Sequence, residues 1–364
     1  MYLSAEILAI ILGLSIGTVV GVTAFASNFC AVGAVADILF AKDWRRMRTW
    51  MLAGGIAIIG AQTLETAALV NLGSSPYLIP RISWLALIIG GTTFGFGMSL
   101  ASGCVNRELV RTGAGSLKSL ITIIVIGIFA AMTASGILKP LNDYLSDFGD
   151  SVTLMAPGFD RFFAIFPGID GILVRWVFTL IFGGGLIWIS IKDKWFRASK
   201  DQLFGGLIIG LTIPAAWLAV NFLNDRDSAV ANYDALNFIA PLGQSLSAAL
   251  VSGYPVAIFG IFALLGVPIG SFLCAAFTQN LSLETFSNPS DLPHNVIGGA
   301  LMGFGGTLSI GCTFGQGLSG LSTLSVGSML VITAIWFGCI WGIRYFENGS
   351  VIQGLLASLP KRRR

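Results

Sequence analysis

The chain has 364 residues, of which 55% are hydrophobic and only 11% are charged, and its mean hydropathy is +0.83. A soluble domain carries about 25% charged residues, so this composition excludes a soluble globular protein. It indicates an all-α integral membrane protein, because the apolar runs are too long for the strands of a membrane β-barrel. The net charge of +3 comes with no tract of mixed basic and aromatic residues, which argues against nucleic-acid binding.

The apolar runs predict about nine transmembrane helices and four shorter helical pieces between them. The predicted spans are residues 5–25, 49–72, 82–101, 117–137, 171–191, 203–223, 254–277, 296–311 and 326–346. The short pieces are residues 26–41, 101–116, 241–253 and 312–325, with Gly, Ser, Asn or Pro at their edges. Such pieces predict discontinuous helices that line a protected cavity, because irregular backbone cannot face lipid. The first run has no basic residue before it, so we interpret it as a retained span and not a cleaved signal peptide.

The distribution of basic residues predicts the orientation in the membrane. Most of the 21 Lys and Arg residues follow the first, third, fifth and ninth predicted spans, whereas the loops on the other side are rich in Asp. Cytoplasmic loops are the ones that carry excess Lys and Arg. We therefore expect a multi-pass membrane protein with its N-terminus outside and its C-terminus in the cytoplasm.

Two similar segments indicate an internal repeat. "GFGMSLASGC" (Gly95–Cys104) matches "GFGGTLSIGC" (Gly303–Cys312) at six of its positions, 208 residues later. The predicted spans that contain these segments cross the membrane in opposite directions. Inverted-topology repeats of this kind are typical of secondary transporters, whose substrate site lies between the halves. We expect the halves to be residues 1–170 and 201–364, joined by a connecting span at 171–200.

Three of the five cysteines follow predicted helix breaks. Cys104 and Cys312 end the two repeated glycine-rich segments, and Cys30 in "ASNFCAVG" follows a similar break. A short helix is expected to begin directly after each cysteine, near Ala31, Asn106 and Phe314, and its free amides suit an anion. A weakly donating S–H group suits a substrate that presents soft sulfur. The candidate substrate-binding residues are Cys30, Cys104, Cys312, Gly103, Gly311, Asn106 and Gln316.

Other features have simpler interpretations. Cys274 and Cys339 are expected to fill space in helices, and the glycine motifs at 13–21 and 205–210 to form helix-packing faces. Arg107, Glu108 and Arg111 have helical spacing and predict a solvated inner end with local ion pairs, although Arg107 could attract an anion there. His294 is the only histidine, so we expect neither a metal site nor a cofactor. Asp37 and Glu65 lie in apolar stretches and are candidates to carry a proton.

Four segments resemble a known family. "NFCAVGAVADILFAKDWRRMR", "GFGMSLASGCVNRELVRTGAGSLKSL", "APLGQSLSAALVSG" and "GALMGFGGTLSIGCTFGQGLSGLSTLSVGS" are similar to the YeeE/YedE family of bacterial membrane transporters for sulfur compounds. The resemblance covers essentially the whole chain. It implies nine spanning and four short helices in two inverted halves, with functional cysteines at Cys30, Cys104 and Cys312. It also implies thiosulfate uptake by successive contacts with these thiols, and a small cytoplasmic TusA-like sulfurtransferase as a partner.

The sequence leaves some alternatives open. A membrane sulfurtransferase or thiol redox protein is the main alternative to a transporter, and a sulfur-sensing membrane partner is another. The chain has no C-x-x-C pair and no His or Lys near the three thiols, which favours a transporter over an enzyme. The thiol environment does not separate thiosulfate from sulfite, sulfide, persulfide or selenium species.

Overall fold

The computed structural model describes residues 4–78, 81–147, 152–153, 158, 171–226, 233–250, 256–285 and 291–358. The long helices are α1 (Ala5–Ala26), α3 (Arg45–Thr66), α4 (Trp84–Leu100), α6 (Leu117–Ala134), α12 (Lys200–Asn224), α14 (Ile258–Phe277), α15 (Asp291–Leu308) and α16 (Val326–Asn348). A further long helix is continuous through α9 (Gly171–Thr179), the π-helix η4 (Leu180–Gly184) and α10 (Gly185–Ile191). The strands β1 (Arg81–Ile82) and β2 (Val152–Thr153) form one short antiparallel pair. The molecule is therefore an α-helical bundle.

The predicted short helices are present between the long ones. They are α2 (Ala31–Ala36), continued by η1 (Asp37–Ala41), then α5 (Val105–Gly113), α13 (Ile239–Leu250) and η5 (Gly315–Gly320). The remaining pieces are η2 (Leu72–Ser74), η3 (Pro76–Leu78), α7 (Lys139–Asp147), α11 (Lys194–Ala198) and α17 (Val351–Ser358). Each predicted short segment therefore holds a helix that is too short to cross a bilayer.

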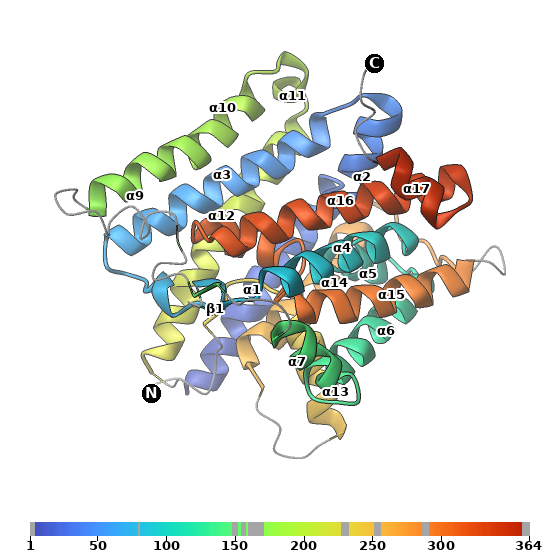
Figure 1. Cartoon of the computed structure of the whole chain (residues 1–364). Coiled ribbons are helices and arrows are strands. Elements are labelled where there is room, and N and C mark those ends of the chain that lie inside the picture. Colours follow the sequence, from blue (N-terminus) through green and yellow to red (C-terminus); the bar gives the residue numbers. More distant parts are fainter. Residues whose placement is uncertain are drawn as a thin grey trace.

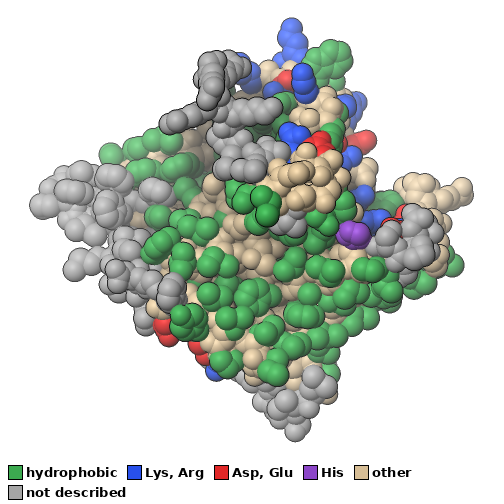
Figure 2. All heavy atoms as spheres, turned by 45° about the vertical axis from the view of Figure 1, so that its right-hand side comes forward, with side chains coloured by type: hydrophobic (Ala, Val, Ile, Leu, Met, Phe, Trp, Pro, Cys, Tyr) green, Lys and Arg blue, Asp and Glu red, His purple; other side chains and the backbone are tan. Residues whose placement is uncertain are grey.

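Seven helical segments in the described part of the chain are long and apolar enough to cross a membrane. These segments include all the predicted spans except those that correspond to α3 and α15. The start of α3 carries three arginines, and α15 begins with Asp291 and includes His294. Figure 2 shows a broad apolar face with Lys and Arg gathered toward one side of it. The chain is a multi-pass membrane protein, and the count of nine spans remains a prediction.

The two halves pack against each other reciprocally (Figure 1). Each half has the same order of elements: long, short, long, long, short, long. In the first half these are α1, α2, α3, α4, α5 and α6, and in the second α12, α13, α14, α15, η5 and α16. The first long helix of each half packs on the third element of the other, as α1 on α14 and α12 on α3. In the same way α4 packs on α16 and α15 on α6. Exchange of these two sets of helices thus preserves the main contacts. The inverted orientation of the halves and their boundaries at residues 1–170 and 201–364 remain predictions.

Glycines allow the backbones of paired helices to come very close. A Cβ atom added at Gly17 of α1 would lie 2.0 Å from the carbonyl oxygen of Ala263 in α14. At Gly95 of α4 it would lie 2.1 Å from the carbonyl oxygen of Ile335 in α16. No larger side chain fits such contacts without separating the helices. The glycine motif at 13–21 is therefore a helix-packing face, as the sequence predicted.

Candidate functional site

Three loops share one backbone form, and each ends in a cysteine. We call residues 27–30, 101–104 and 309–312 the first, second and third cysteine loops. Each follows a long helix and contains a left-handed residue two positions before the cysteine: Asn28 (φ 51°), Ser102 (φ 59°) and Ile310 (φ 59°). The next amide then donates to a carbonyl five residues earlier, in the bonds Phe29 to Ala24, Gly103 to Met98 and Gly311 to Gly306. This helix ending turns the chain sharply and places the cysteine at the start of a short helix.

The three cysteines occupy equivalent buried positions. Cys30 precedes α2 in extended conformation, and its sulfur accepts a hydrogen bond from the amide of Gly33 at 3.4 Å. Cys104 precedes α5, also in extended conformation. The sulfur of Cys312 accepts from the amide of Gly315 at 3.5 Å, at the start of η5. All three residues are buried, and the prediction of a short helix directly after each is confirmed.

The fold brings the three thiols together from three separate helix breaks. The Cys104 thiol lies in the middle of the group, because it is near enough to interact electrostatically with both Cys30 and Cys312. It also lies beside the amide of Ala31 and the hydroxyl of Thr313, which belong to the first and third breaks. The second cysteine loop is thus in contact with both of the others.

An aromatic cluster joins the first and third cysteine loops. The ring of Phe29 stacks on Trp50 of α3 with centroids 4.3 Å apart. Phe314, two residues after Cys312, packs edgewise on both rings at 5.8 and 5.9 Å. Phe238 contacts Phe314 at 5.3 Å. These large apolar rings exclude water from the space beside the thiols and hold the two loops in a fixed relation.

Several polar groups near the thiols are buried without a hydrogen-bond partner in the described part of the chain. They are both amide atoms of Asn106 and the indole nitrogen of Trp50. The hydroxyl of Thr313 is also buried, and the weakly bonding thiol of Cys104 is the one group beside it in the described part of the chain. Asn106 and Thr313 are each only 1% exposed. Buried polar groups are almost always hydrogen-bonded, since leaving one unpaired costs about 1–3 kcal/mol. These groups are therefore available to a polar guest.

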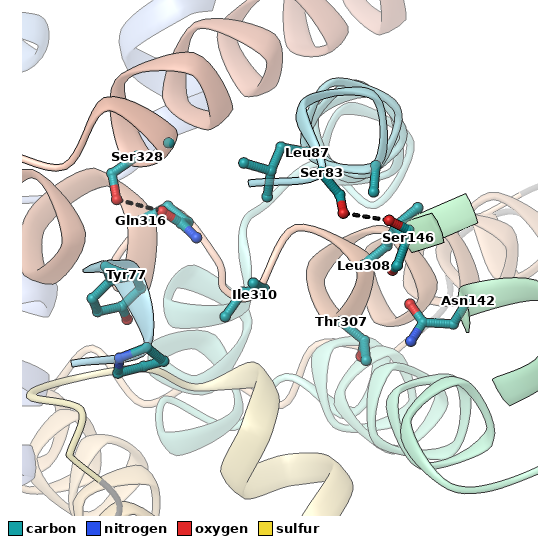
Figure 3. A pocket seen from close by; sticks show the side chains of 13 residues that line it. Tyr77, Ser83, Leu87, Asn142, Ser146, Thr307, Leu308, Ile310, Gln316 and Ser328 are labelled. Carbon is teal, nitrogen blue, oxygen red and sulfur yellow. Dashed lines mark hydrogen bonds between the residues drawn. The ribbon is translucent and has the colours of Figure 1, made fainter. Parts of the chain in front are cut away.

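Gln316 is held by hydrogen bonds at both ends of its side-chain amide. Its Nε2 atom donates to the carbonyl of Ser309 at 2.6 Å, and its Oε1 atom accepts from the hydroxyl of Ser328 at 2.7 Å (Figure 3). Because both ends of the amide are engaged, Gln316 holds the third cysteine loop in place. Gly311 has a φ of 156°, and a Cβ atom there would lie 3.2 Å from Cγ of Gln316. Glycine is required at this position by the backbone and by the close side chain.

Glu108 corrects the sequence interpretation of the segment after Cys104. The predicted solvated inner end is wrong for this residue, which is 1% exposed. The reason is that α5 packs against α6 and α14, so one side of this polar helix is covered. The Ser119 side chain interacts with the Glu108 carboxyl, but the Oε1 atom of this carboxyl has no hydrogen-bond partner among the described residues and lies 3.9 Å from Nη1 of Arg111. A Cβ atom at Gly103 would lie 2.1 Å from the same Oε1 atom, which explains the glycine before Cys104.

Two cavities adjoin the third cysteine loop. The first, which we call the Tyr77 cavity, has a volume of about 300 Å³, and its lining includes Tyr77, Ser83, Gln316 and Ser328. The second, which we call the Asp234 cavity, has a volume of about 520 Å³, and its lining includes Asp234, Asn237, Gln244 and Gly311. Pro76, Thr307 and Ile310 line both. Figure 3 shows Ile310 between Tyr77 and Gln316 on one side and Thr307 on the other. Ile310 is β-branched with positive φ, which is a strained combination, and it stands at the boundary of the two cavities.

A third cavity adjoins the first cysteine loop and the short helix α5 that follows the second. This Arg107 cavity of about 610 Å³ is lined by Asn28, Arg107, Arg111 and Cys274 among others. The guanidinium group of Arg107 donates to the side chain of Asn28 at 3.5 Å. Arg107 and Arg46 both act electrostatically on Cys30. The acids Asp201 and Glu284 also line this cavity, and Arg111 pairs with Glu284 at 3.2 Å. The arginines near Cys30 favour an anion there, and these two acids oppose it.

The remaining sequence candidates are placed as follows. Asp37 pairs with Arg46 at 3.2 Å, while Glu65 accepts from the amide of Leu72 at 2.6 Å and pairs with Arg175 at 3.5 Å. Both acids therefore hold local structure.

Cys339 is buried beside Ser99, whose hydroxyl donates to its carbonyl and its thiol. Cys274 is partly exposed and lines the Arg107 cavity. Among the residues that the structure describes, no group of three His, Cys, Asp or Glu side chains is arranged to hold a metal ion.

Comparison with known proteins identifies the family of the chain. The chain is 23% identical to the thiosulfate transporter TsuA of Escherichia coli (strain K12) over 346 residues, which are 90% of this chain and 93% of the relative. It is 22% identical to the thiosulfate transporter TsuA of Spirochaeta thermophila over 339 residues, 87% of this chain and 93% of the relative. The family described as "Sulphur transport" matches residues 26–341. This match includes all three cysteine loops and both halves, and the chain therefore belongs to this family of membrane transporters for sulfur compounds.

Proposed function

We propose that the protein takes up thiosulfate, or a closely related sulfur anion, by passing it along Cys312, Cys104 and Cys30 in turn. The observation that supports this most is the meeting of three buried thiols from separate helix breaks beside buried polar groups without partners. The two relatives described above are named thiosulfate transporters.

The chemistry of the group suits a soft anion. Thiosulfate presents a terminal sulfur and three oxygens, and neutral thiols are weak donors that contact such a sulfur without holding it tightly. The side-chain N–H groups of Asn106 and the hydroxyl of Thr313 can donate to its oxygens. Such weak, successive contacts let the anion move on, whereas a buried Lys or Arg at each step would trap it.

The direction of transport follows from what lies at each end. Cys312 interacts with Tyr77 and Asp234, at the cavities that the basic-residue pattern places outside. Cys30 interacts with Arg46 and Arg107, at the cavity it places inside. In this proposal the N-terminus is outside the inner membrane and the C-terminus is cytoplasmic; Lys361 to Arg364, which favour this orientation, lie outside the described residues.

The halves and the partner complete the proposal. Residues 1–170 and 201–364 form the two inverted halves, with 171–200 as the connecting span, and the anion passes between them. A small TusA-like sulfurtransferase receives the sulfur at the cytoplasmic mouth of the Arg107 cavity. Such a partner gives transport a direction by consuming the product.

Uptake of ³⁵S-labelled thiosulfate into proteoliposomes tests the proposal. We expect Cys104→Ala and Cys312→Ala each to lower the initial rate at least about tenfold, because one contact in the row is lost. Cys339→Ala is the matched control, since this thiol is also fully buried and interacts electrostatically with Cys30 and Cys104, but belongs to α16 and not to a cysteine loop. Near wild-type uptake by the two loop variants contradicts the mechanism. Mass spectrometry is used to look for a persulfide on Cys104 or a disulfide during turnover. Either product would mean that sulfur moves by covalent transfer and not by the non-covalent contacts proposed here.

A further inference from the structure

The Asp234 cavity contains an unexpected charge for the entrance of an anion transporter. Among its described lining residues, Asp234 is the only charged side chain. The Oδ1 atom of Asp234 accepts a hydrogen bond from the phenol of Tyr77 at 2.7 Å, and the Asn237 amide also interacts with the carboxyl. The carboxyl acts electrostatically on the Cys312 thiol. An anion that reaches Cys312 from this cavity must pass a group that is negative when ionised.

The repulsion is large enough to decide whether the anion binds. At a separation of about 5 Å and an effective dielectric constant of about 20, two like unit charges weaken binding by more than about 100-fold. The effect is larger for a dianion. No Lys or Arg lines the cavity in the described part of the chain to offset it. A proton on the carboxyl removes the repulsion and leaves a neutral group that can donate to an anion oxygen.

We propose that Asp234 is a proton-binding site coupled to anion entry, so that a proton occupies its carboxyl whenever the anion is bound at Cys312. This inference rests on the proposed function, because it assumes that an anion travels to Cys312. Coupling is reciprocal: protonation favours the anion, and the anion favours protonation by the same factor.

The surroundings of Asp234 support a proton that binds and leaves near neutral pH. Burial raises the pKa of Asp234 from 3.8 to about 6. Since a raised pKa keeps the acid protonated at higher pH, the neutral form dominates below about pH 6 and is lost above it. Burial also raises the pKa of Tyr77 well above 10, so this phenol stays a hydrogen-bond donor throughout that range.

The groups that face Asp234 in the described structure are few. They are Tyr77 from η3, the Cys312 thiol from the third cysteine loop, and Asn237 with the neighbouring Tyr233 from its own segment. The lining residues from α6 are Ala130 and Ala134, and those from α13 are Ile239, Ala240, Gly243 and Gln244. None of these is ionised near pH 6, so the pH dependence of this cavity belongs to Asp234.

The pH profile of thiosulfate uptake tests the proposal. Proteoliposomes with equal pH on both sides are assayed from pH 5 to pH 8 at a substrate concentration well below saturation. Thiosulfate stays a dianion over this range, so any change comes from the protein. For the wild type we expect the initial rate to be highest below about pH 6 and to fall up to about 100-fold by pH 8. Asp234→Asn keeps the shape of the side chain but removes its charge. The uptake rate of this variant is expected not to change with pH and to exceed the wild-type rate at pH 8.

A control variant outside the cavity lining shows whether the pH dependence belongs to Asp234. Asp225→Asn changes an exposed acid at the end of α12, and is expected to keep the wild-type profile. If Asp234→Asn is not recovered folded, Tyr77→Phe replaces it; loss of the hydrogen bond to the ionised carboxyl shifts the profile to higher pH. A flat wild-type profile, or a wild-type profile in Asp234→Asn, overturns the inference while uptake stands. Absence of uptake by the wild type at every pH instead overturns the proposed function.

Discussion

Asn106 has a buried amide that the protein itself does not satisfy, and this has a measurable cost. Replacing Asn106 with Leu, which has a similar size, removes the unpaired groups. We expect the variant to be more resistant to thermal unfolding in detergent, by about 1–3 kcal/mol, because no buried amide is left without partners. Uptake of thiosulfate is expected to fall at least about tenfold, since the amide no longer donates to the substrate.

A second variant tests the same idea at another position. Thr313→Val removes the buried hydroxyl beside the Cys104 thiol and is expected to change stability and uptake in the same two directions. A loss of stability in Asn106→Leu shows that the amide has a structural partner. Wild-type uptake in the same variant shows that Asn106 does not contact the substrate. Both quantities are obtained from one purified sample, by a melting curve and by transport after reconstitution.

The sequence predicts some residues of the site well and others poorly, for physical reasons. Cys30, Cys104 and Cys312 were identifiable because each follows small or polar residues that end an apolar helix. Asn106 and Gln316 were identified by position alone. In the described structure the side-chain amide of Asn106 has no hydrogen-bond partner, whereas that of Gln316 is hydrogen-bonded at both ends. Trp50, Thr313 and Asp234 were missed, since their importance depends on which helices pack beside them. Periodicity gives the face of a helix but does not give its neighbours.

At the scale of elements, the glycine contacts between α1 and α14 set how closely the helices approach. We expect Gly17→Ala to destabilise the protein by about 1–3 kcal/mol or more, because the new methyl group overlaps the carbonyl of Ala263, 2.0 Å away, and the helices must separate. The measurement is the fraction of monodisperse protein that remains after heating in detergent, followed by size-exclusion chromatography.

A matched control is available in the peripheral helix. Figure 1 shows α10 alongside α3 at the edge of the bundle. A Cβ atom at Gly185 in this helix meets no atom within 4 Å. Gly185→Ala is therefore expected to be neutral or to stabilise by up to about 1 kcal/mol, since alanine favours a helix over glycine. Equal behaviour of the two variants contradicts the view that Gly17 sets the helix spacing.

Element boundaries were predictable where local chemistry fixes them. The breaks before α2, α5 and η5 follow from Gly, Ser and Asn at helix ends, and the structure has them at the expected places. The left-handed conformation of Ile310 was not predictable, because β-branched residues avoid it and only the surrounding contacts impose it. The π-helical segments η1, η4 and η5 also lack a sequence signal. They widen the helix by local packing and not by residue type.

At the scale of the whole molecule, the reciprocal packing of the halves places the three thiols at their meeting point. Cys30 and Cys104 come from the first half and Cys312 from the second. The Tyr77 and Asp234 cavities are lined by residues of the third cysteine loop, and the Arg107 cavity is lined by Asn28 of the first cysteine loop and by Arg107 of α5. In the mechanism that we propose, access to the thiols alternates between the two sides through small movements of the cysteine loops, such as displacement of the strained Ile310.

The orientation in the membrane can be tested with a native thiol. Cys274 is partly exposed and lines the Arg107 cavity, while the other four cysteines are buried. If the C-terminus is cytoplasmic, this cavity opens to the cytoplasm. A membrane-impermeant maleimide is then expected to label Cys274 in inside-out vesicles and not in right-side-out vesicles, with labelling read by mass spectrometry of the intact protein.

The same labelling also reports on the anion in the cavity, which makes the test more specific. Arg107 and Arg111 line this cavity together with Cys274, so bound thiosulfate is expected to slow the reaction in inside-out vesicles by at least about twofold. Chloride at equal ionic strength is the control for screening of the arginines. Cys274→Ser is expected to abolish labelling and keep uptake. Labelling of Cys274 in right-side-out vesicles contradicts the orientation, because the basic cavity then faces the outside and the anion enters past Cys30.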